Sequence, residues 1–267
     1  MSLSKPVVMG ILNATPDSFY AGSRKQTEAE IADRANQIIS EGGRIIDVGA
    51  FSTRPGADVV GEEEETARLK RALAIVRREQ PDAPVSVDTY RPEVARRCVE
   101  EFGADIVNDV SEGGLTGIVG QPIHERGDMF ATVAALGVPY ILMSVKPTVR
   151  QMLYAFAEEV QRLRSLGAKD IILDPGFGFG KDLGQNYAVL AQMDKLSALG
   201  LPLLVGVSRK SMVYRLVGGD PATALNGTTA VHALSLAKGA SILRAHDVRQ
   251  AAETIEIYAK MSAAAPF

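Results

Sequence analysis

The chain has 267 residues, 46% of them hydrophobic, which is enough for one domain (residues 1–267) with a sizeable core. Its formal net charge is −3 and its isoelectric point is near 5.7, which argue against a surface that binds nucleic acid. One cysteine, Cys98, excludes an intrachain disulfide. Neither a signal segment nor a long apolar span is found, so we expect a cytoplasmic protein with no membrane partner.

Eight short apolar segments follow one another along the chain, and most are rich in Val, Ile and Leu, as expected of strands buried on both faces. In chain order they are Val7–Leu12, Arg44–Gly49, Pro84–Thr89, Ala104–Asp109, Pro139–Ser144, Ile171–Asp174, Pro202–Ser208 and Ser241–Asp247. Segments with helical spacing lie between them, several ending in glycine. Examples are Thr27–Gly42, Gly61–Glu79, Arg91–Gly103, Met152–Gly167, Asn186–Gly200 and Thr228–Gly239.

This alternation predicts an α/β fold, a single-domain (β/α)8 TIM barrel, because eight strands with intervening helices fill the usual length of that fold. A doubly wound open sheet is the rival fold. We favour the barrel, since the strand count is eight and no G-x-G-x-x-G follows the first strand.

Almost every predicted strand ends on polar side chains, which a barrel would bring together on the face where active sites sit. They are Asn13, Ser52 and Thr53, Asp88, Asn108 and Asp109, Ser144, Asp174, Ser208 to Lys210, and Arg244 to Asp247. The basic groups follow the seventh and eighth strands, where barrels often hold phosphate. The acids and amides follow the first, third, fourth and sixth strands. The sequence therefore predicts an anion pocket on one side of the mouth and a pocket for a polar heterocycle on the other.

The segment Ile171–Asp182, I-I-L-D-P-G-F-G-F-G-K-D, places a carboxylate at a strand end before a glycine-rich loop. Asp174 can accept hydrogen bonds from ring N–H and amino groups, and Phe179 can pack on the ring face. A structural turn with Asp174 as a helix cap is the alternative. Asp88 and Asn108, at two other strand ends, would complete a set able to read the polar edge of a pteridine.

Two other uses of these acids are weaker. A metal site is disfavoured because none of the three histidines lies at a ligand spacing near them. A hydrolase with paired carboxylates leaves the basic cluster without a role.

The anion side contains a helix start and the last strand. Lys210 and Ser211 begin a predicted helix, whose free N–H groups would bind a carboxylate or phosphate. Arg244 and His246 alternate on one face of the last strand and would hold pyrophosphate. Asn13 could offer its amide oxygen to Mg²⁺, which proteins usually bind through few side chains, water and substrate phosphates.

Other charged or reactive residues are interpreted as structural. The acidic run Glu62–Glu65 indicates the exposed first turn of a helix, and Cys98 a buried apolar position. His124 and His232 lie in ordinary loop and helix contexts.

Together these segments resemble dihydropteroate synthase over nearly the whole chain. The resemblance runs through G-I-L-N-A-T-P-D-S-F, D-V-G-A-F-S-T-R-P-G-A, S-V-D-T, I-V-N-D-V, D-P-G-F-G-F-G-K, S-R-K-S and R-A-H-D-V, in that order. It implies a transferase that joins p-aminobenzoate to 6-hydroxymethyl-7,8-dihydropterin pyrophosphate and releases pyrophosphate, by a substitution with strong SN1 character. It also implies Mg²⁺, a homodimer and a sulfonamide target.

The resemblance implies a role for each matching residue. Pterin contacts are Asp88, Asn108, Met143, Asp174, Phe179 and Lys210; the pyrophosphate and Mg²⁺ side is Asn13, Arg244 and His246; the p-aminobenzoate side is Thr53, Pro55, Phe179 and Ser211. Asp17 and Arg54 lie on the first two loops, which would close and exclude water.

Three departures from the family pattern are present. Phe51 stands where an acid is usual, the fifth strand ends M-S-V-K-P (Met143–Pro147) instead of M-H-M-R-G, and Ser111–Gly127 is longer than expected. The departures at Phe51 and Met143–Pro147 keep one alternative open, a catalytically inactive pterin-binding paralogue. A second alternative is a methyltetrahydrofolate methyltransferase-like domain, which shares the acids and amides of the pterin pocket. The second has no need of the basic cluster, and release of pyrophosphate with both substrates present would separate all three.

Overall fold

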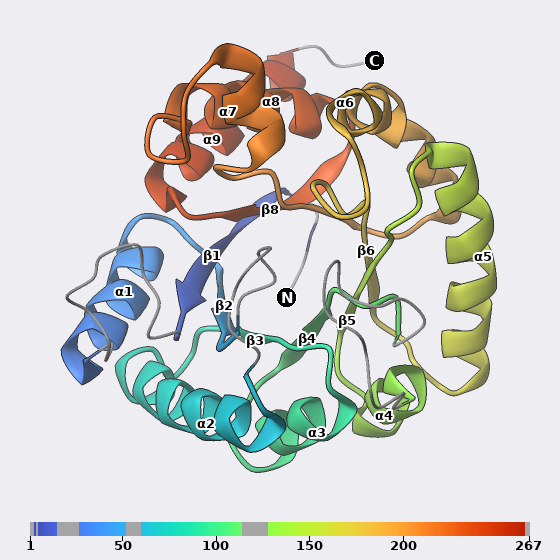
Figure 1. Cartoon of the computed structure of the whole chain (residues 1–267). Coiled ribbons are helices and arrows are strands. Elements are labelled where there is room, and N and C mark those ends of the chain that lie inside the picture. The colour runs from blue at the N-terminus through green and yellow to red at the C-terminus, as the bar shows by residue number, and fades with distance from the viewer. Residues whose placement is uncertain (1–2, 4, 15–26, 52–59, 114–127, 265–267) are drawn as a thin grey trace.

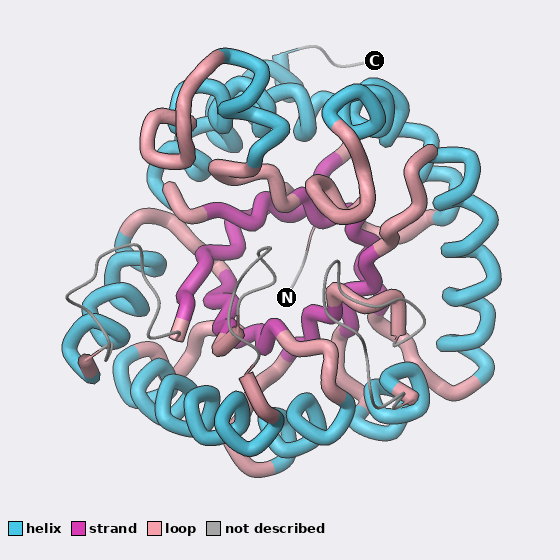
Figure 2. Tube along the Cα trace, in the orientation of Figure 1, coloured by secondary structure: helices cyan, strands magenta, loops and turns pink. Residues whose placement is uncertain are grey.

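The computed structural model describes residues 3, 5–14, 27–51, 60–113 and 128–264. Eight parallel strands form a closed barrel in sequence order, with β8 paired to β1. Helices surround the barrel on the outside (Figures 1 and 2). The strands are β1 Val7–Asn13, β2 Ile45–Gly49, β3 Val85–Asp88, β4 Ile106–Asp109, β5 Tyr140–Met143, β6 Ile171–Asp174, β7 Leu203–Val205 and β8 Ala240–Ala245. The predicted (β/α)8 barrel and its eight strands are confirmed.

The helices agree with the prediction in place, though not in every bound. They are α1 Glu28–Ser40, α2 Glu62–Glu79, α3 Pro92–Glu100, α4 Met129–Leu136, α5 Val149–Ser165, α6 Leu183–Gln192, α7 Ser211–Val217, α8 Leu225–Ala237 and α9 Val248–Ala264, with a 3₁₀ helix, η1, at Met193–Leu199. The single helix predicted over Asn186–Gly200 is wrong, since the chain tightens into the 3₁₀ helix after Gln192. Helix α5 begins earlier than predicted because Thr148 caps it by accepting a bond from Gln151 N.

The barrel interior is arranged in layers that place the polar residues. Seven buried apolar side chains form the lower layer: Met9, Ile45, Ile106, Ile141, Ile172, Leu204 and Ile242. Successive side chains on a strand point to opposite faces, so the residue two positions further on also points into the barrel. Those residues are Asp47 on β2, Asn108 on β4, Met143 on β5, Asp174 on β6 and Arg244 on β8. The apolar layer therefore supports a polar layer nearer the mouth.

The interpretation of Glu62–Glu65 as only an exposed helix turn is wrong for one member. The four residues do form the first turn of α2, but Glu65 is fully buried. Its carboxylate accepts a hydrogen bond from Thr89 Oγ1 (2.6 Å) and pairs with Arg91. Glu65 thus joins α2 to the chain that follows β3.

The structural interpretations of Cys98 and His232 agree with their burial in α3 and α8. Burial raises the pKa of the Cys98 thiol to about 12, and it lowers the pKa of His232 to about 4. Among the described residues, no helix is both long enough and apolar enough to span a membrane.

Two glycines have similar left-handed backbone angles but differ in the space around them. A comparison of the two therefore distinguishes backbone strain from steric crowding of an added side chain. Gly137 (φ 67°) ends α4, and a Cβ there would meet nothing within 4 Å. Gly176 (φ 66°) follows β6, and a Cβ there would run into the carbonyl oxygen of Ser144.

We predict that Gly137→Ala lowers the free energy of unfolding by about 1–2 kcal/mol, from backbone strain alone. Gly176→Ala should lower it by about 1–3 kcal/mol more, because backbone atoms must move apart. Urea unfolding of both variants measures the difference in free energy of unfolding. Equal losses would contradict the close approach of the loop after β6 to the loop after β5.

Candidate active site

The polar layer brings together side chains from strands that are far apart in the sequence. Asp88 ends β3 and lies beside Asn108 of β4 in the sheet register, and Met143 of β5 lies beside Asp174 of β6. Arg244 reaches them from β8. The sequence prediction that these residues meet at the carboxyl ends of the strands is confirmed.

Arg244 is shared between two carboxylates. Its Nε donates to Asp47 Oδ2 at 2.6 Å, and its Nη2 donates to Asp88 Oδ2 at 2.7 Å. The Asn108 side-chain amide lies 3.3 Å from Asp47 Oδ2 and 3.4 Å from Asp47 Oδ1. The guanidinium group of Arg244 thus connects its own strand, β8, to β2 and β3.

Burial dominates the electrostatics of this group. It raises the pKa of Asp88 to about 7, although the positive charge of Arg244 acts in the opposite direction. Burial also acts to lower the pKa of Arg244, but Asp47 and Asp88 raise it above its ordinary value. Arg244 therefore stays charged at neutral pH, while Asp88 can exchange a proton there.

Asp174 and Lys210 place a second set of opposite charges at the mouth and interact electrostatically. Burial raises the pKa of Asp174, an effect that Lys210 opposes, and Asp174 Oδ1 accepts a bond from Gly176 N at 2.8 Å. Lys210 Nζ donates to Phe177 O at 2.6 Å and lies 4.7 Å from the centre of the Phe179 ring. Burial lowers the pKa of Lys210 to about 8. Acid, ammonium and aromatic ring therefore lie together at the mouth, a combination of groups that suits a planar polar ligand.

An apolar wall lies beside these groups. Met143 and Val110 are buried together, and Phe179, Phe51 and Tyr90 pack against them. The rings of Phe51 and Tyr90 meet edge to face with centres 5.1 Å apart. The departure at Phe51 therefore extends the apolar wall and leaves the polar layer in place.

The residues predicted for the anion side lie at the same end of the barrel. Asn13 is exposed at the end of β1, and Ser211 is the first residue of α7. His246 follows β8, with Nδ1 3.2 Å from Ser208 Oγ. Within the described ranges, no cluster of three or more His, Cys, Asp or Glu side chains is placed to hold a metal ion.

Some polar strand ends do not face the mouth. The carboxylate of Asp109 accepts bonds from Ser111 and from Tyr140 Oη (2.7 Å), and it is buried between strand and helix. Arg209, predicted for the basic cluster, instead binds Asp247 with two hydrogen bonds of 2.8 and 2.7 Å. Both predictions are wrong because alternation on the strand, or the turn, directs these side chains outward.

Four predicted site residues, Asp17, Thr53, Arg54 and Pro55, lie outside the described residues, as does most of the longer loop Ser111–Gly127. Asp47 is the residue that sequence reasoning missed. It lies inside its strand instead of at the end. The usable signal was its position two residues after Ile45, which is the same spacing as that of Asp174 after Ile172.

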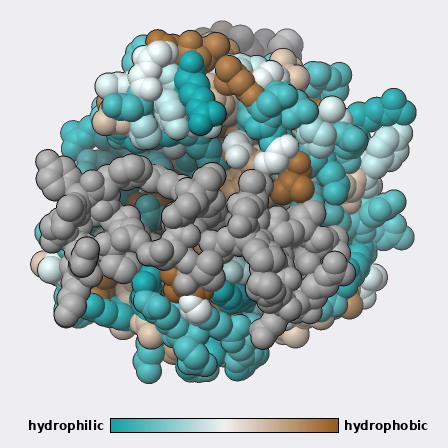
Figure 3. Space-filling view, in the orientation of Figure 1, coloured by the Kyte–Doolittle hydropathy of each residue, from teal (hydrophilic) through white to brown (hydrophobic). Residues whose placement is uncertain are grey.

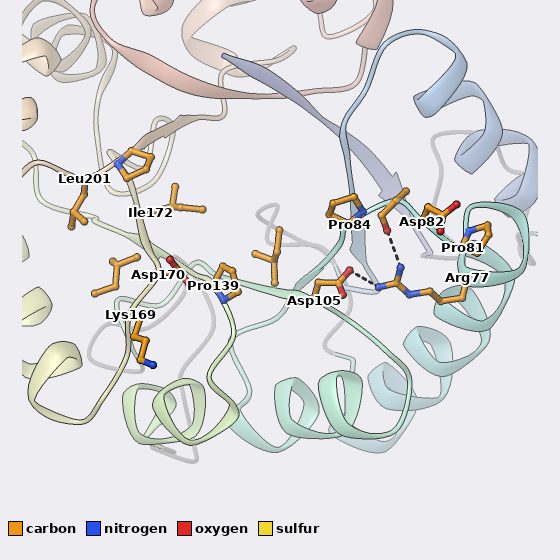
Figure 4. Close-up of a pocket in the computed structure, with 14 residues that line it drawn as sticks. Arg77, Pro81, Asp82, Pro84, Asp105, Pro139, Lys169, Asp170, Ile172 and Leu201 are labelled. Atoms are coloured by element: carbon orange, nitrogen blue, oxygen red, sulfur yellow. Dashed lines mark hydrogen bonds and ion pairs between the residues drawn. The ribbon is translucent and has the colours of Figure 1, made fainter. Parts of the chain in front are cut away.

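A hollow of about 540 Å³ lies at the opposite end of the barrel (Figure 4). Several of its lining residues directly precede strands, among them Pro84, Asp105, Pro139, Asp170 and Pro202. Active sites of such barrels form at the carboxyl ends of strands, so this hollow is separate from the site.

Comparison with known proteins agrees with this geometry. The pattern of a family described as "Pterin binding enzyme" matches residues 9–246. The dihydropteroate synthase of Escherichia coli is 38% identical, covering 96% of this chain and 92% of its own. Two solved dihydropteroate synthases are each 33% identical: that of Xanthomonas albilineans with 4-aminobenzoic acid (TM-score 0.87; 100% of this chain, 96% of that one) and that of Yersinia pestis with a sulfonamide drug (TM-score 0.85; 98% and 96%). The chain belongs to the pterin-binding enzymes and, among them, to the dihydropteroate synthase family.

Asp88 yields a prediction of pH-dependent stability. Its pKa in the folded protein, about 7, lies above its ordinary value of 3.8, so ionisation destabilises the fold increasingly as pH rises from about 4 to 7. Asn at this position stays neutral, and Asp47 still pairs with Arg244. We therefore expect Asp88→Asn to unfold at a higher temperature than the wild type at pH 8, with a smaller gap at pH 5.

Thermal unfolding at both pH values measures this gap. Asp194→Asn is the control, since Asp194 is an exposed acid paired with Lys238. A gap that does not grow with pH, or that matches the control, would show that Asp88 is not destabilised by burial.

Proposed function

We propose that this chain catalyses the reaction implied by its family: p-aminobenzoate displaces pyrophosphate from 6-hydroxymethyl-7,8-dihydropterin pyrophosphate and dihydropteroate forms. The observation that carries the proposal is the barrel mouth, where acids and an amide (Asp88, Asn108, Asp174) lie beside two cations (Arg244, Lys210). A substrate with a polar ring and an anionic leaving group needs both kinds of partner.

The pterin side would use Asp174, Asn108, Asp88 and Lys210. Carboxylate oxygens accept from ring N–H and amino groups, while Lys210 and the Asn108 amide can donate to ring oxygen or nitrogen. Met143 and Phe179 would cover the apolar faces of the ring. The planar pocket therefore gives orientation through hydrogen bonds and affinity through burial.

The leaving-group side would use Arg244, His246 and Asn13. Arginine binds phosphate oxygens with two parallel bonds, and Arg244 already lies at the end of β8. The exposed amide of Asn13 fits Mg²⁺ as a single protein ligand, the usual arrangement when phosphates supply other ligands. Bound there, Mg²⁺ would neutralise part of the charge on pyrophosphate.

The p-aminobenzoate side would use Phe179 and Ser211, with Thr53 and Pro55 outside the described residues. The N–H groups at the start of α7 suit a carboxylate. The related Xanthomonas albilineans structure contains 4-aminobenzoic acid, and the Yersinia pestis structure contains a sulfonamide. By that relationship we propose that sulfonamides compete for this side of the site.

The mechanism we propose is electrostatic. The bond from the pterin methylene carbon to the pyrophosphate oxygen breaks first, leaving a cation that the carboxylates of Asp88 and Asp174 stabilise. The arylamine nitrogen then attacks this carbon and loses its proton to solvent. No covalent nucleophile is required, and the only thiol, Cys98, is buried in α3.

The direct test supplies purified protein with both substrates and Mg²⁺ and measures dihydropteroate by mass spectrometry alongside released pyrophosphate. The proposal expects equal amounts of both products when both substrates are present, and no dihydropteroate without p-aminobenzoate. Pterin binding without turnover would favour the inactive paralogue. The methyltransferase-like alternative would likewise release no pyrophosphate, and it leaves Arg244 and Lys210 without a role.

Magnesium dependence is a separate prediction. Removing divalent ions with EDTA should reduce turnover by about tenfold or more, and Mg²⁺ should restore it, because charge on the leaving group is then uncompensated. Asn13→Ala should raise the Mg²⁺ concentration needed for half-maximal rate. Full activity in EDTA would exclude the metal from this mechanism.

A homodimer is also proposed from the family relationship. Exposed apolar side chains occur on three successive helices, Leu216 and Val217 of α7, Leu234 of α8, and Ile257 and Met261 of α9. Brown surface gathers over this region at the upper edge of the molecule (Figure 3). Sedimentation velocity would measure whether the protein in solution has the mass of one chain or of two.

A cytoplasmic location stays a prediction.

A further inference from the structure

Lys181 joins two loops at the barrel mouth. It ends the glycine-rich loop after β6 and precedes Asp182, the N-cap of α6. Its Nζ donates to Ser144 O in the loop after β5 at 3.1 Å, and to Gly176 O and Phe179 O in its own loop at 3.0 and 3.1 Å. An ammonium has three N–H donors, so this contact set uses all of them.

The two loops approach so closely that their carbonyl groups converge. A Cβ on Gly176 would run into Ser144 O, and one on Gly180 would lie 3.1 Å from Val145 O. Carbonyl oxygens that face one another repel unless a donor lies between them. The ammonium of Lys181 is that donor.

The surrounding charges favour the ammonium form. Burial lowers the pKa of Lys181 to about 8, while the carboxylates of Asp174 and Glu112 act to raise it. Lys210 also interacts electrostatically with Asp174, and the charge of Lys181 contributes to lowering the pKa of Lys210. Lys181 therefore remains mainly charged at neutral pH.

The residues that Lys181 holds lead directly to the pocket. Gly176 N donates to Asp174 Oδ1 at 2.8 Å, and Phe179 N donates to Gly176 O at 3.1 Å. The Phe179 ring in turn lies 4.7 Å from Lys210 Nζ. Lys181 binds the backbone of this loop, so it acts on the positions of these side chains through Gly176 and Phe179.

The segment Met143–Pro147, which departs from the family pattern, connects these two loops to a third, the loop after β4. Ser144 Oγ donates to Glu112 Oε1 at 2.7 Å, and Val145 N donates to the same oxygen at 3.1 Å. Lys146 Nζ lies 3.6 Å from Glu112 Oε2. The loops after β4, β5 and β6 are thus joined through Glu112, Ser144 and Lys181.

We propose that Lys181 is a positioning residue. Its ammonium ion fixes the loop after β6 against the loop after β5, and it thereby holds the Phe179 ring in position to contact p-aminobenzoate. The kinetic consequence rests on the proposed function. The positional consequence, an ordered backbone at Gly176 and Phe179, does not.

The first variant is Lys181→Met, which keeps side-chain length and removes the charge. We expect the KM for p-aminobenzoate to rise about tenfold or more, with a smaller fall in kcat, because a displaced ring weakens binding of this substrate. We also expect faster hydrogen exchange at the amides of Gly176 and Phe179. Lys195→Met is the control, since Lys195 is exposed on η1 and should change neither quantity.

Chemical rescue separates the charge from general packing. In Lys181→Cys, alkylation with 2-bromoethylamine restores an ammonium at nearly the same position, while 2-bromoethanol adds a neutral hydroxyl. The only native cysteine, Cys98, is buried, and burial raises its pKa to about 12, so it should not react in the folded protein.

The ammonium adduct should restore both the KM and the slow exchange, and the hydroxyl adduct should restore neither. Equal rescue by both adducts, or Lys181→Met with unchanged KM and exchange, would overturn the proposal. If the wild type forms no dihydropteroate, the proposed function fails, and the exchange rates with the two adducts still decide whether Lys181 orders the loop.

Discussion

The buried guanidinium of Arg244 sets the charge balance of the barrel mouth. Asp47 and Asp88 lie on different strands, and each would be an unpaired buried charge without it. Removing Arg244 would leave both carboxylates without compensation, and loss of the partner of a buried charge typically costs about 3–5 kcal/mol. In the proposed reaction, the anionic leaving group would compete with Asp88 for Arg244, which would couple the proposed pyrophosphate side of the site to the pterin side.

Alternation along the strands separates the residues that stabilise the barrel from those that form the site. Ile45, Ile106, Ile172 and Ile242 fill the lower layer, and the residues two positions later carry the acids, the amide and the guanidinium. The apolar layer gives these polar side chains rigid support and excludes water from below. The raised pKa of Asp88 and the lowered pKa of Lys210 both follow from that burial.

Much of this arrangement could be predicted from the sequence, because parallel strands carry their carboxyl ends to one face. Asp88, Asn108, Asp174 and Lys210 were identified from their places at strand and helix ends. Side-chain direction could not be predicted in the same way. Asp47 was missed because it lies inside a strand, and Arg209 was assigned to the mouth although its turn directs it to Asp247. The link between Glu112 and Ser144 joins distant segments, and no local pattern indicates it.

The central claim, that Arg244 is shared between Asp88 and the leaving group, can be tested by calorimetry. Pyrophosphate binding with Mg²⁺ would be measured at pH 7 in buffers with different ionisation enthalpies, for the wild type and for Asp88→Asn. If pyrophosphate draws Arg244 away, the pKa of Asp88 rises and its carboxylate takes up a proton. We predict greater proton uptake in the wild type than in the variant. Equal uptake in both would contradict the account.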